Sequence, residues 1–307
     1  MEYSYYRSHS GSDLEGETVM MDAAFMYLDG GKHSWNGTTF INTASYDYDG
    51  ATRMYPQYNG DNSLYMHDAD WSSMALNDQS EPQGFSLGYR YYSLNMDIHN
   101  TTMSGVASVI GAMGYGYYSN YDLEFLSITD STFVHYKGYS ELNSGNTIYM
   151  NDMCLIMNGG DGNVVDGNTF TNCGVGALIE RSPYHYTHNA NEVGVDNLTL
   201  TNNVFNDGGE IADIWYYGSN EAQGANISGN ELNPSGGHAI AIYSGNTGNV
   251  LIEGNTVNGG EDPIYLNRVD NFEIDNNDIT GISDASSTGI YVFRGHGNIT
   301  DNTLVDA

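Results

Sequence analysis

The stretch IEGNTV at residues 252–257 recurs, with changes, at five other places in the chain. In each copy an asparagine stands three residues after one apolar side chain and two residues before another. The other copies are VDGNTF (165–170), LTNNVF (200–205), ISGNEL (227–232), IDNNDI (274–279) and ITDNTL (299–304). The asparagines, from Asn168 to Asn302, follow one another at 35, 27, 25, 22 and 25 residues. A repeat of short, slightly variable period is typical of a solenoid, in which similar turns of chain stack on one another.

Each copy predicts short β-strands. In the segment NVLIEGNTVNGGEDPIYLNRVD (249–270), apolar and polar residues alternate over short runs that are separated by Gly, Asn and Asp. This pattern is typical of strands joined by turns, and no segment keeps the 3.6-residue apolar period of a helix. Three strands per coil, each paired with its equivalent in the next coil, predict an all-β parallel β-helix with coils about 4.8 Å apart.

The same frame is recognisable earlier in the chain with a small residue in place of asparagine. The central residues there are Thr38, Ala69, Thr101 and Ser131. We therefore expect about ten coils over residues 32–307, with longer loops in the early half, and an irregular or edge segment over residues 1–31. Because the last residues stop inside a frame without a polar cap, we expect the chain to be a segment of a longer protein whose export signal lies elsewhere.

The repeated asparagine is expected to be structural. Its amide group carries two donors and an acceptor, so amides stacked on successive coils can bond to one another as an asparagine ladder. Asparagine also tolerates the left-handed backbone that a tight bend requires. The apolar residues of the frame are expected to stack as inward columns, one running from Ile128 to Ile299 and the other from Phe133 to Leu304.

Composition limits the partners that the protein can have. The 307 residues contain 39 Asp and Glu but only 8 Lys and Arg, which gives a net charge of −31. Nucleic acid and anionic membranes bind through clustered positive charge, so neither is an expected partner. No apolar run approaches the length needed to insert into a membrane. The two cysteines, Cys154 and Cys173, fall in different repeats, and we expect small buried side chains in preference to a disulfide.

The asparagine frames give the chain a resemblance to the right-handed parallel β-helix repeat proteins of the pectate-lyase-like superfamily. The resemblance covers roughly residues 33–307. It implies a fold and a location at the cell surface or outside the cell, together with a carbohydrate ligand, often an acidic polysaccharide, along the strand after the Gly-rich turn. It does not imply one chemistry, because the superfamily includes lyases, hydrolases, epimerases, surface proteins and phage tailspikes.

That strand carries aromatic residues in consecutive coils. It is predicted at ALIERS (177–182), DIWYYGS (213–219), AIYSGN (241–246), PIYLNR (263–268) and GIYVFR (289–294). If Ile214, Ile242, Ile264 and Ile290 point inward, the residue after each one points outward. The sequence thus predicts a single stripe of Trp215, Tyr243, Tyr265 and Tyr291, with Tyr217 at its edge. Such amphipathic rings suit the apolar faces and hydroxyls of sugars, although rings on a strand also simply pack.

Basic and histidine residues flank this stripe. Arg268 and Arg294 occupy equivalent places in adjacent coils and Arg181 closes an earlier strand, so each is expected to pair with an anion. The anion is either a carboxylate such as Asp262, Asp270 or Asp284, which we favour, or a bound uronate or sulfate. His185 and His188 lie in the insertion SPYHYTHNANE (182–192), which is expected to overhang the same face. This pair could bind a metal ion or a sugar hydroxyl, but two histidines without a third ligand more often belong to a polar loop.

The catalytic signals are weaker than the binding signals. Glycoside hydrolysis needs two carboxylates at a defined separation, and the best pair in adjacent coils near the stripe is Glu180 with Asp213. The lyases of the superfamily use calcium held by acidic residues, but no local motif for such a site is found. No cofactor is therefore predicted, and calcium remains the one alternative.

These observations favour an exported or cell-surface β-helix that binds a polysaccharide or surface glycan without catalysis. A polysaccharide lyase or glycoside hydrolase acting on acidic polysaccharide is the first alternative. A structural stalk or adhesin repeat is the second. The oligomeric state is not predicted.

Overall fold

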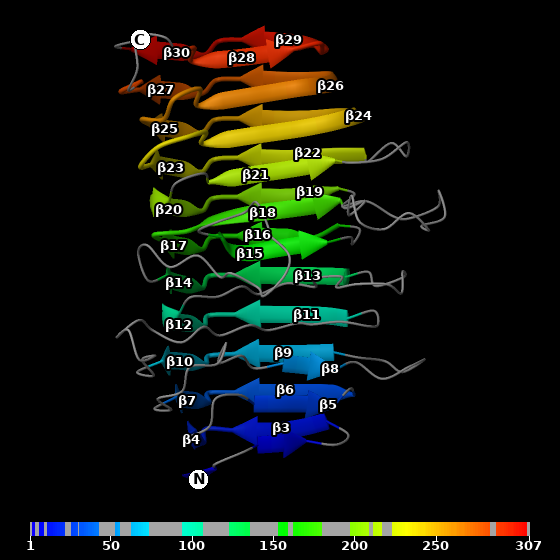
Figure 1. The fold of residues 1–307 in the computed structure, drawn as a ribbon, viewed down its shortest axis with the longest axis vertical. Coiled ribbons are helices and arrows are strands. Elements are labelled where there is room, and N and C mark those ends of the chain that lie inside the picture. Colours follow the sequence, from blue (N-terminus) through cyan, green and yellow to red (C-terminus); the bar gives the residue numbers. More distant parts are fainter. Residues whose placement is uncertain are drawn as a thin grey trace, which may run out of the picture.

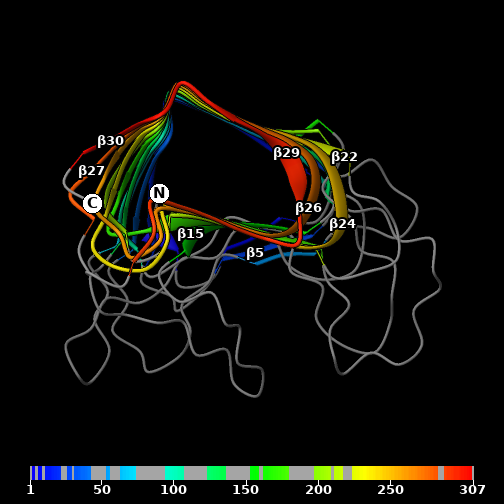
Figure 2. The same cartoon turned by 90° about the horizontal axis from the view of Figure 1, so that it is seen from above.

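The structure is a computed structural model, and its strands stack in sequence order along one axis (Figure 1). It describes residues 2–3, 6–8, 11–21, 26–29, 31–42, 53–55, 63–73, 94–106, 123–135, 153–158, 162–179, 197–208, 211–216, 223–282 and 287–305. Every regular element in these ranges is a β-strand, and every pairing between strands is parallel. Seen along the axis, the chain outlines a triangle with three strand-bearing sides (Figure 2).

The first side holds the strands that precede the bend of each frame. They are β3 (Gly11–Glu15), β6 (Lys32–Asn36), β9 (Ser63–His67), β11 (Leu94–His99), β13 (Leu123–Thr129), β16 (Val164–Asp166), β19 (Leu198–Thr201), β22 (Gln223–Ser228), β29 (His296–Thr300) and the later parts of β24 (Ile240–Glu253) and β26 (Ile264–Asp275). Each pairs in register with the strand of the next coil, so equivalent residues form columns along the axis.

The second side holds the strands that follow the bend. It is a 12-stranded sheet. Its strands are β1 (Glu2–Tyr3), β4 (Thr18–Met21), β7 (Thr39–Asn42), β10 (Asp70–Ser73), β12 (Thr102–Val106), β14 (Thr132–His135), β17 (Thr169–Thr171), β20 (Val204–Gly208), β23 (Glu231–Pro234), β25 (Thr256–Asn258), β27 (Asp278–Thr280) and β30 (Thr303–Val305).

The third side is built in two parts. The early coils contribute a 3-stranded sheet of β2 (Tyr6–Ser8), β5 (Met26–Asp29) and β8 (Arg53–Tyr55). The later coils contribute β15 (Met153–Asn158), β18 (Gly174–Ile179), β21 (Ala212–Tyr216), the first parts of β24 and β26, and β28 (Ile290–Phe293). In β24 and β26 the chain runs from the third side into the first side without a break, which joins the two sides into one 15-stranded sheet.

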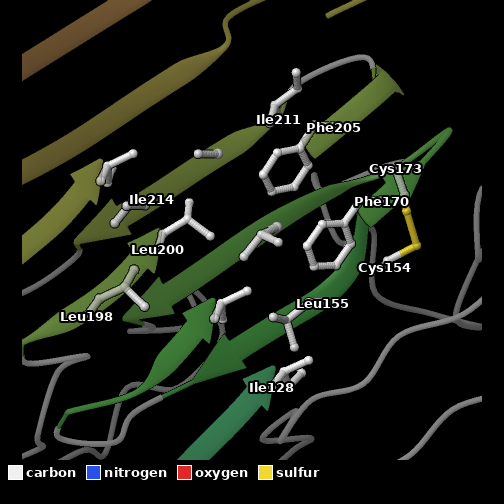
Figure 3. Close-up of a cluster of buried hydrophobic side chains, with 14 of the residues drawn as sticks. Ile128, Cys154, Leu155, Phe170, Cys173, Leu198, Leu200, Phe205, Ile211 and Ile214 are labelled. Atoms are coloured by element: carbon white, nitrogen blue, oxygen red, sulfur yellow. A yellow bond between two sulfur atoms is a disulfide. The ribbon is translucent and has the colours of Figure 1, made fainter. Parts of the chain in front are cut away.

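The two predicted apolar columns form much of the core. Parallel pairing aligns Ile128 with Val165, Leu200, Ile227 and the later isoleucines of the first column. In the second column Phe133, Phe170 and Phe205 stack with ring centroids 5.1 and 4.6 Å apart, and Figure 3 shows Phe170 beside Phe205. The side chains of both columns are buried as far as Ile274 and Ile279, because the alternation of each strand turns every second residue inward. The predicted columns are therefore confirmed over these coils, whereas Ile299 and Leu304 at their ends are 49% and 43% exposed.

The asparagine ladder is also confirmed. From Asn168 to Asn277, the Nδ2 group of each ladder asparagine donates to the Oδ1 atom of the next one at 2.8–3.0 Å. Each backbone N–H in this run donates to the same oxygen, as Asn203 does to Asn230 at 2.9 Å. The ladder continues into the earlier coils, where Ser131 donates its N–H to Asn168 and its Oγ accepts from the N–H of Thr101.

The left-handed backbone of the bend was predicted at the ladder asparagine, but the residue before it adopts that conformation. The positive φ angles fall on the residue before each ladder position, such as Gly254 (φ 63°) before Asn255 and Asn276 (φ 53°) before Asn277. The reason is the side-chain direction. The ladder amide must point inward to meet its neighbours, so the preceding residue absorbs the turn, where Gly, Asn and Asp are tolerated.

The β-helix begins earlier than residue 32, the boundary expected from the sequence. Strands β3 and β4 pair in register with β6 and β7, and Leu14 and Val19 align with Trp35 and Phe40. Residues 11–21 thus form a further coil with Glu17 at its ladder position. The frame was not recognised in this segment because a glutamate replaces the asparagine or small residue at the ladder position.

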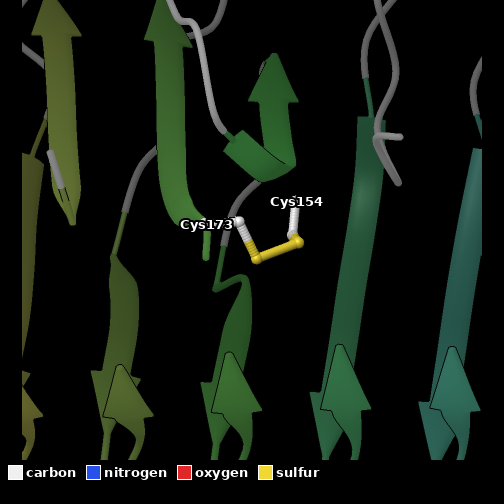
Figure 4. The surroundings of a disulfide bond; sticks show 2 residues. All are labelled: Cys154 and Cys173. Atoms are coloured by element: carbon white, nitrogen blue, oxygen red, sulfur yellow. A yellow bond between two sulfur atoms is a disulfide. The ribbon is translucent and has the colours of Figure 1, made fainter. Parts of the chain in front are cut away.

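The expectation for the cysteines is wrong. Cys154 and Cys173 form a disulfide, with their Cα atoms 5.4 Å apart (Figure 4). They lie on adjacent coils, since β15, which contains Cys154, pairs with β18, which begins directly after Cys173. A separation of 19 residues along the chain becomes a direct contact because one full coil lies between the two cysteines.

Candidate functional site

The predicted binding strands do lie side by side on the third side, but their register differs from the expected one. Parallel pairing aligns Trp215 with Tyr243, and Tyr265 with Tyr291. Between these two pairs, Tyr265 aligns with Ala241, and Tyr243 aligns with Asn267. The expected single stripe is therefore wrong, and the aromatic residues occupy two columns that are offset by two residues.

The physical reason is that a shift of two residues keeps every inward side chain inward. Ile264 pairs with Ile240 and Leu266 pairs with Ile242, so both registers bury the same kind of residue. Alternation predicts which side a residue faces, but only the packed structure shows which residue lies beside it.

Despite the offset, three tyrosines and one histidine form a continuous group of rings, which we call the aromatic cluster: His238, Tyr243, Tyr265 and Tyr291. Tyr265 is central to it. Its ring centroid lies 4.8 Å from that of His238, 5.1 Å from that of Tyr243 and 5.3 Å from that of Tyr291. The alignment of Tyr265 with the small, fully buried Ala241 leaves room for these neighbouring rings.

The rings of the aromatic cluster use their faces mainly against one another. Tyr265 and Tyr291 are stacked with only 4° between their planes, and His238 is stacked on Tyr265 at 24°. His238 belongs to the coil before Tyr265 and Tyr291 to the coil after it, so Tyr265 has a neighbour on each face. Tyr291 is the most exposed of the three tyrosines, at 39%.

Polar groups at the aromatic cluster are fixed by short contacts. His238 Nδ1 lies 2.9 Å from the carbonyl oxygen of Asp262. Nδ1 must carry the proton to donate to a carbonyl, so the neutral ring presents Nε2 as an acceptor. Asn267 places its Nδ2 group 3.5 Å from the Tyr265 hydroxyl, and its buried Oδ1 atom has no hydrogen-bond partner in the protein.

The two arginines next to the aromatic cluster occupy equivalent corners, as predicted. Arg268 and Arg294 directly follow the register pair Asn267 and Phe293, and both have positive φ angles. Arg294 stacks over the Phe293 ring at 4.9 Å. Within the described ranges neither arginine forms a salt bridge with Asp262 or Asp270, so the favoured carboxylate pairing is not found there.

Those two carboxylates have other partners. Asp262 Oδ1 accepts from the N–H of Thr288 at 2.7 Å, and Asp270 Oδ1 lies 2.9 Å from Nδ1 of His296. Asp284, the third expected partner, lies outside the described residues.

Several predicted site residues also fall outside the described residues. They are Glu180, Arg181, His185, His188 and Tyr217. For Asp213 and Trp215 the structure gives the strand register alone. Asp213 pairs with Gly176 on one side and with Ala241 on the other, so it lies in the column of Tyr265 and Tyr291. Glu180 comes four residues after Gly176 and is therefore not the register partner of Asp213.

Sequence reasoning missed three residues of this surface. His238 lies in the turn before β24, where alternation gives no direction for a side chain. Asn267 and Phe293 follow the inward Leu266 and the partly buried Val292, so alternation alone would have predicted both as outward. No described helix is long and apolar enough to cross a membrane.

Comparison with known proteins agrees with this architecture. The family model described as right handed beta helix region matches residues 214–307. The search of curated proteins and the search of solved structures returned no match. The matched segment contains the last ladder asparagines and all four rings of the aromatic cluster, and the same parallel coils extend to the N-terminal side of it. The chain folds as a right-handed parallel β-helix, and its residues 214–307 match that family model.

Proposed function

We propose that this β-helix is an exported or cell-surface protein that binds carbohydrate at the aromatic cluster, without catalysis. One observation carries the proposal. Rings from three successive coils meet on the outer side of one sheet, with exposed Tyr291 and Phe293 at one end of the group. Tyrosine combines an apolar ring with a hydroxyl, which suits ligands that present both C–H faces and hydroxyls.

The geometry favours a particular mode of contact. Because the faces of Tyr265 are taken by His238 and Tyr291, it would offer a sugar its edge and hydroxyl and not its face. Tyr291 and Phe293, each 39% exposed, are the better candidates for contact through a ring face. His238 Nε2 would add an acceptor for sugar hydroxyls, and the guanidinium of Arg268 would add donors.

Export is supported by the disulfide and by the charge. Disulfides persist in oxidising compartments and are rare in reducing ones, and Cys154 is bonded to Cys173. The net charge of −31 disfavours binding to nucleic acid or anionic membranes. A polysaccharide or surface glycan remains the partner that the side chains of this surface suit best.

A structural stalk is the second candidate, and the ring stacking itself favours it. Tyrosines in successive coils that stack on one another stabilise a rod whether or not a ligand binds. A lyase or hydrolase acting on acidic polysaccharide is the weaker candidate, because the register partners of Asp213 are Gly176 and Ala241 and neither is a carboxylate.

A panel of neutral and uronic polysaccharides separates these functions. We expect retention on at least one of them, and about five-fold weaker retention after Tyr291→Ala, since loss of an aromatic contact costs about 1 kcal/mol. Tyr65→Ala is the matched control, because Tyr65 is a similarly exposed tyrosine (44%) on the first side. Equal losses in the two variants, or no retention by the unaltered protein, would refute carbohydrate binding at the aromatic cluster. New reducing or unsaturated ends, lost after Glu180→Gln or Asp213→Asn, would establish an enzyme instead.

A further inference from the structure

A second polar group lies far from the aromatic cluster, on the first side of the early coils. His67 at the end of β9 and His99 at the end of β11 are register partners on adjacent coils. Asn36 and Thr129 flank them in the same column, so two imidazoles stand next to each other between two neutral side chains. Their side chains are 40% and 46% exposed, which leaves them accessible to a small solute.

Each histidine has one ring nitrogen in contact with a side chain of the following coil. His67 Nε2 lies 3.3 Å from Asp97 Oδ2. His99 Nδ1 lies 2.9 Å from Thr129 Oγ1, with Asp130 Oδ2 further away at 3.6 Å. When the nitrogen that makes the contact carries the proton, His67 Nδ1 and His99 Nε2 keep their lone pairs.

This arrangement is the one that metal-binding histidines use. A histidine that ligates a metal almost always donates its other N–H to a carboxylate, a carbonyl or water, which fixes its tautomer and orientation. Here Asp97 supports His67 in this way, and the Thr129 hydroxyl takes the same place beside His99. From these contacts we propose that His67 and His99 form a binding site for a divalent transition-metal ion such as Zn²⁺, with Asp97 and Thr129 orienting the two ligands.

The ring separation fits such a site. With Zn–N bonds of about 2.0–2.1 Å and a tetrahedral angle, two ligating imidazoles have centroids roughly 5 Å apart. The centroids of His67 and His99 are 5.8 Å apart, with 80° between the ring planes. A small rotation of two half-exposed side chains closes this difference, and it costs little because no core packing is disturbed.

The ligand type selects the class of metal. Imidazole nitrogen suits Zn²⁺, Cu²⁺ and Ni²⁺, whereas Ca²⁺ and Mg²⁺ prefer oxygen ligands. Across the described ranges no group of three or more His, Cys, Asp or Glu side chains is arranged to hold a metal ion. The site therefore has two protein ligands, and water completes the coordination. The nearby carboxylates of Asp68, Asp97 and Asp130 raise the local concentration of cations.

Titration calorimetry with Zn²⁺ tests the site near neutral pH. Excess Mg²⁺ in the buffer occupies the diffuse carboxylate sites of this acidic protein. We expect one strong Zn²⁺ site whose affinity falls at least ten-fold after His67→Ala or His99→Ala. The double replacement should have the same affinity as either single replacement. Asp97→Asn should weaken it by about ten-fold, the usual effect of losing a supporting carboxylate.

Two controls locate the binding. His296→Ala removes a histidine that has the same aspartate contact, to Asp270 at 2.9 Å, but no histidine neighbour, and it should leave Zn²⁺ affinity unchanged. The double replacement His185→Ala with His188→Ala tests the histidine pair of the insertion and should also have no effect. Unchanged affinity in both His67→Ala and His99→Ala, or a loss in the insertion variant alone, would overturn the proposal.

A measurement on the unaltered protein covers the case in which a variant misfolds. Diethyl pyrocarbonate modifies accessible imidazoles, and peptide mass spectrometry reads each one separately. Zn²⁺ should protect His67 and His99 while His296 remains reactive. Equal reactivity of His67 and His99 with and without Zn²⁺ would contradict the site.

Discussion

The replacement Asn230→Ala removes one rung from the middle of the asparagine ladder. Asn230 is 2% exposed, and its side chain makes four hydrogen bonds. Its Nδ2 group donates to the Leu200 carbonyl and to Asn255 Oδ1, each at 2.9 Å. Its Oδ1 atom accepts from the backbone N–H of Asn203 at 2.9 Å and from Asn203 Nδ2 at 3.0 Å.

Two of the partner groups keep a second hydrogen bond after the replacement. Asn203 Nδ2 still donates to the Val165 carbonyl, and Asn255 Oδ1 still accepts from the backbone N–H of residue 230. The N–H of Asn203 and the carbonyl of Leu200 lose their ladder partner in a buried environment. Each buried polar group left unpaired costs about 1–3 kcal/mol, so the free energy of unfolding should fall by about 2–6 kcal/mol.

The matched control is Asn302→Ala in the last described coil. Asn302 also makes ladder bonds, to Asn277 and to the Ile274 carbonyl, but it is only partly buried. Water can replace the lost partners there, so we expect a loss of roughly 1 kcal/mol or less. Urea unfolding followed by circular dichroism measures both variants. Hydrogen exchange shows whether the change is confined to neighbouring coils, as nearest-neighbour stability in a solenoid requires. Equal losses in the two variants would refute the claim that buried ladder bonds, and not asparagine itself, stabilise the coils.

Two further predictions concern other coils. Cys173→Ser opens a loop closed by residues 19 apart and should lower the free energy of unfolding by about 3 kcal/mol, measured by urea unfolding under non-reducing conditions; a variant as stable as the oxidised protein would contradict a structural disulfide. Ala69 lies at a ladder position between Thr38 and Thr101 but has no hydroxyl. Ala69→Ser should gain one hydrogen bond of the kind that the Thr101 hydroxyl donates to the Met66 carbonyl, and it should raise the free energy of unfolding by about 0.5–1.5 kcal/mol. Ala69→Val adds no donor and should not raise the free energy of unfolding.

The repeat frame predicted most of the coil geometry because it combines two independent signals. The apolar residues three before and two after each ladder position fix the inward direction of two strands, and both columns are buried as expected, from Ile128 to Ile274 and from Phe133 to Ile279. The amide or small residue between them fixes the bend. The coil formed by residues 11–21 was not predicted, because Glu17 lies at its ladder position.

The candidate site was less predictable, for two separate reasons. Tyr243, Tyr265 and Tyr291 were predicted as outward neighbours, and they are in ring contact. Their register was wrong because period-two alternation is unchanged by a shift of two residues. His238 was missed because it lies in a turn. His67 and His99 each stand two residues before a ladder position, so their pairing is the one that the frame implies.

The sequence by itself determined that the chain folds into stacked parallel coils with an inward asparagine ladder. It could do so because that information is local: an alternation of period two and a bend residue are both contained within a few positions of the frame. Only the tertiary structure decided which side chains from different coils touch outside the frame. It brought Cys154 to Cys173 and Tyr265 between His238 and Tyr291. Loops of variable length separate the ladder positions by 22 to 35 residues in the later coils, so contact between residues outside the frame depends on three-dimensional register, which no count along the chain supplies.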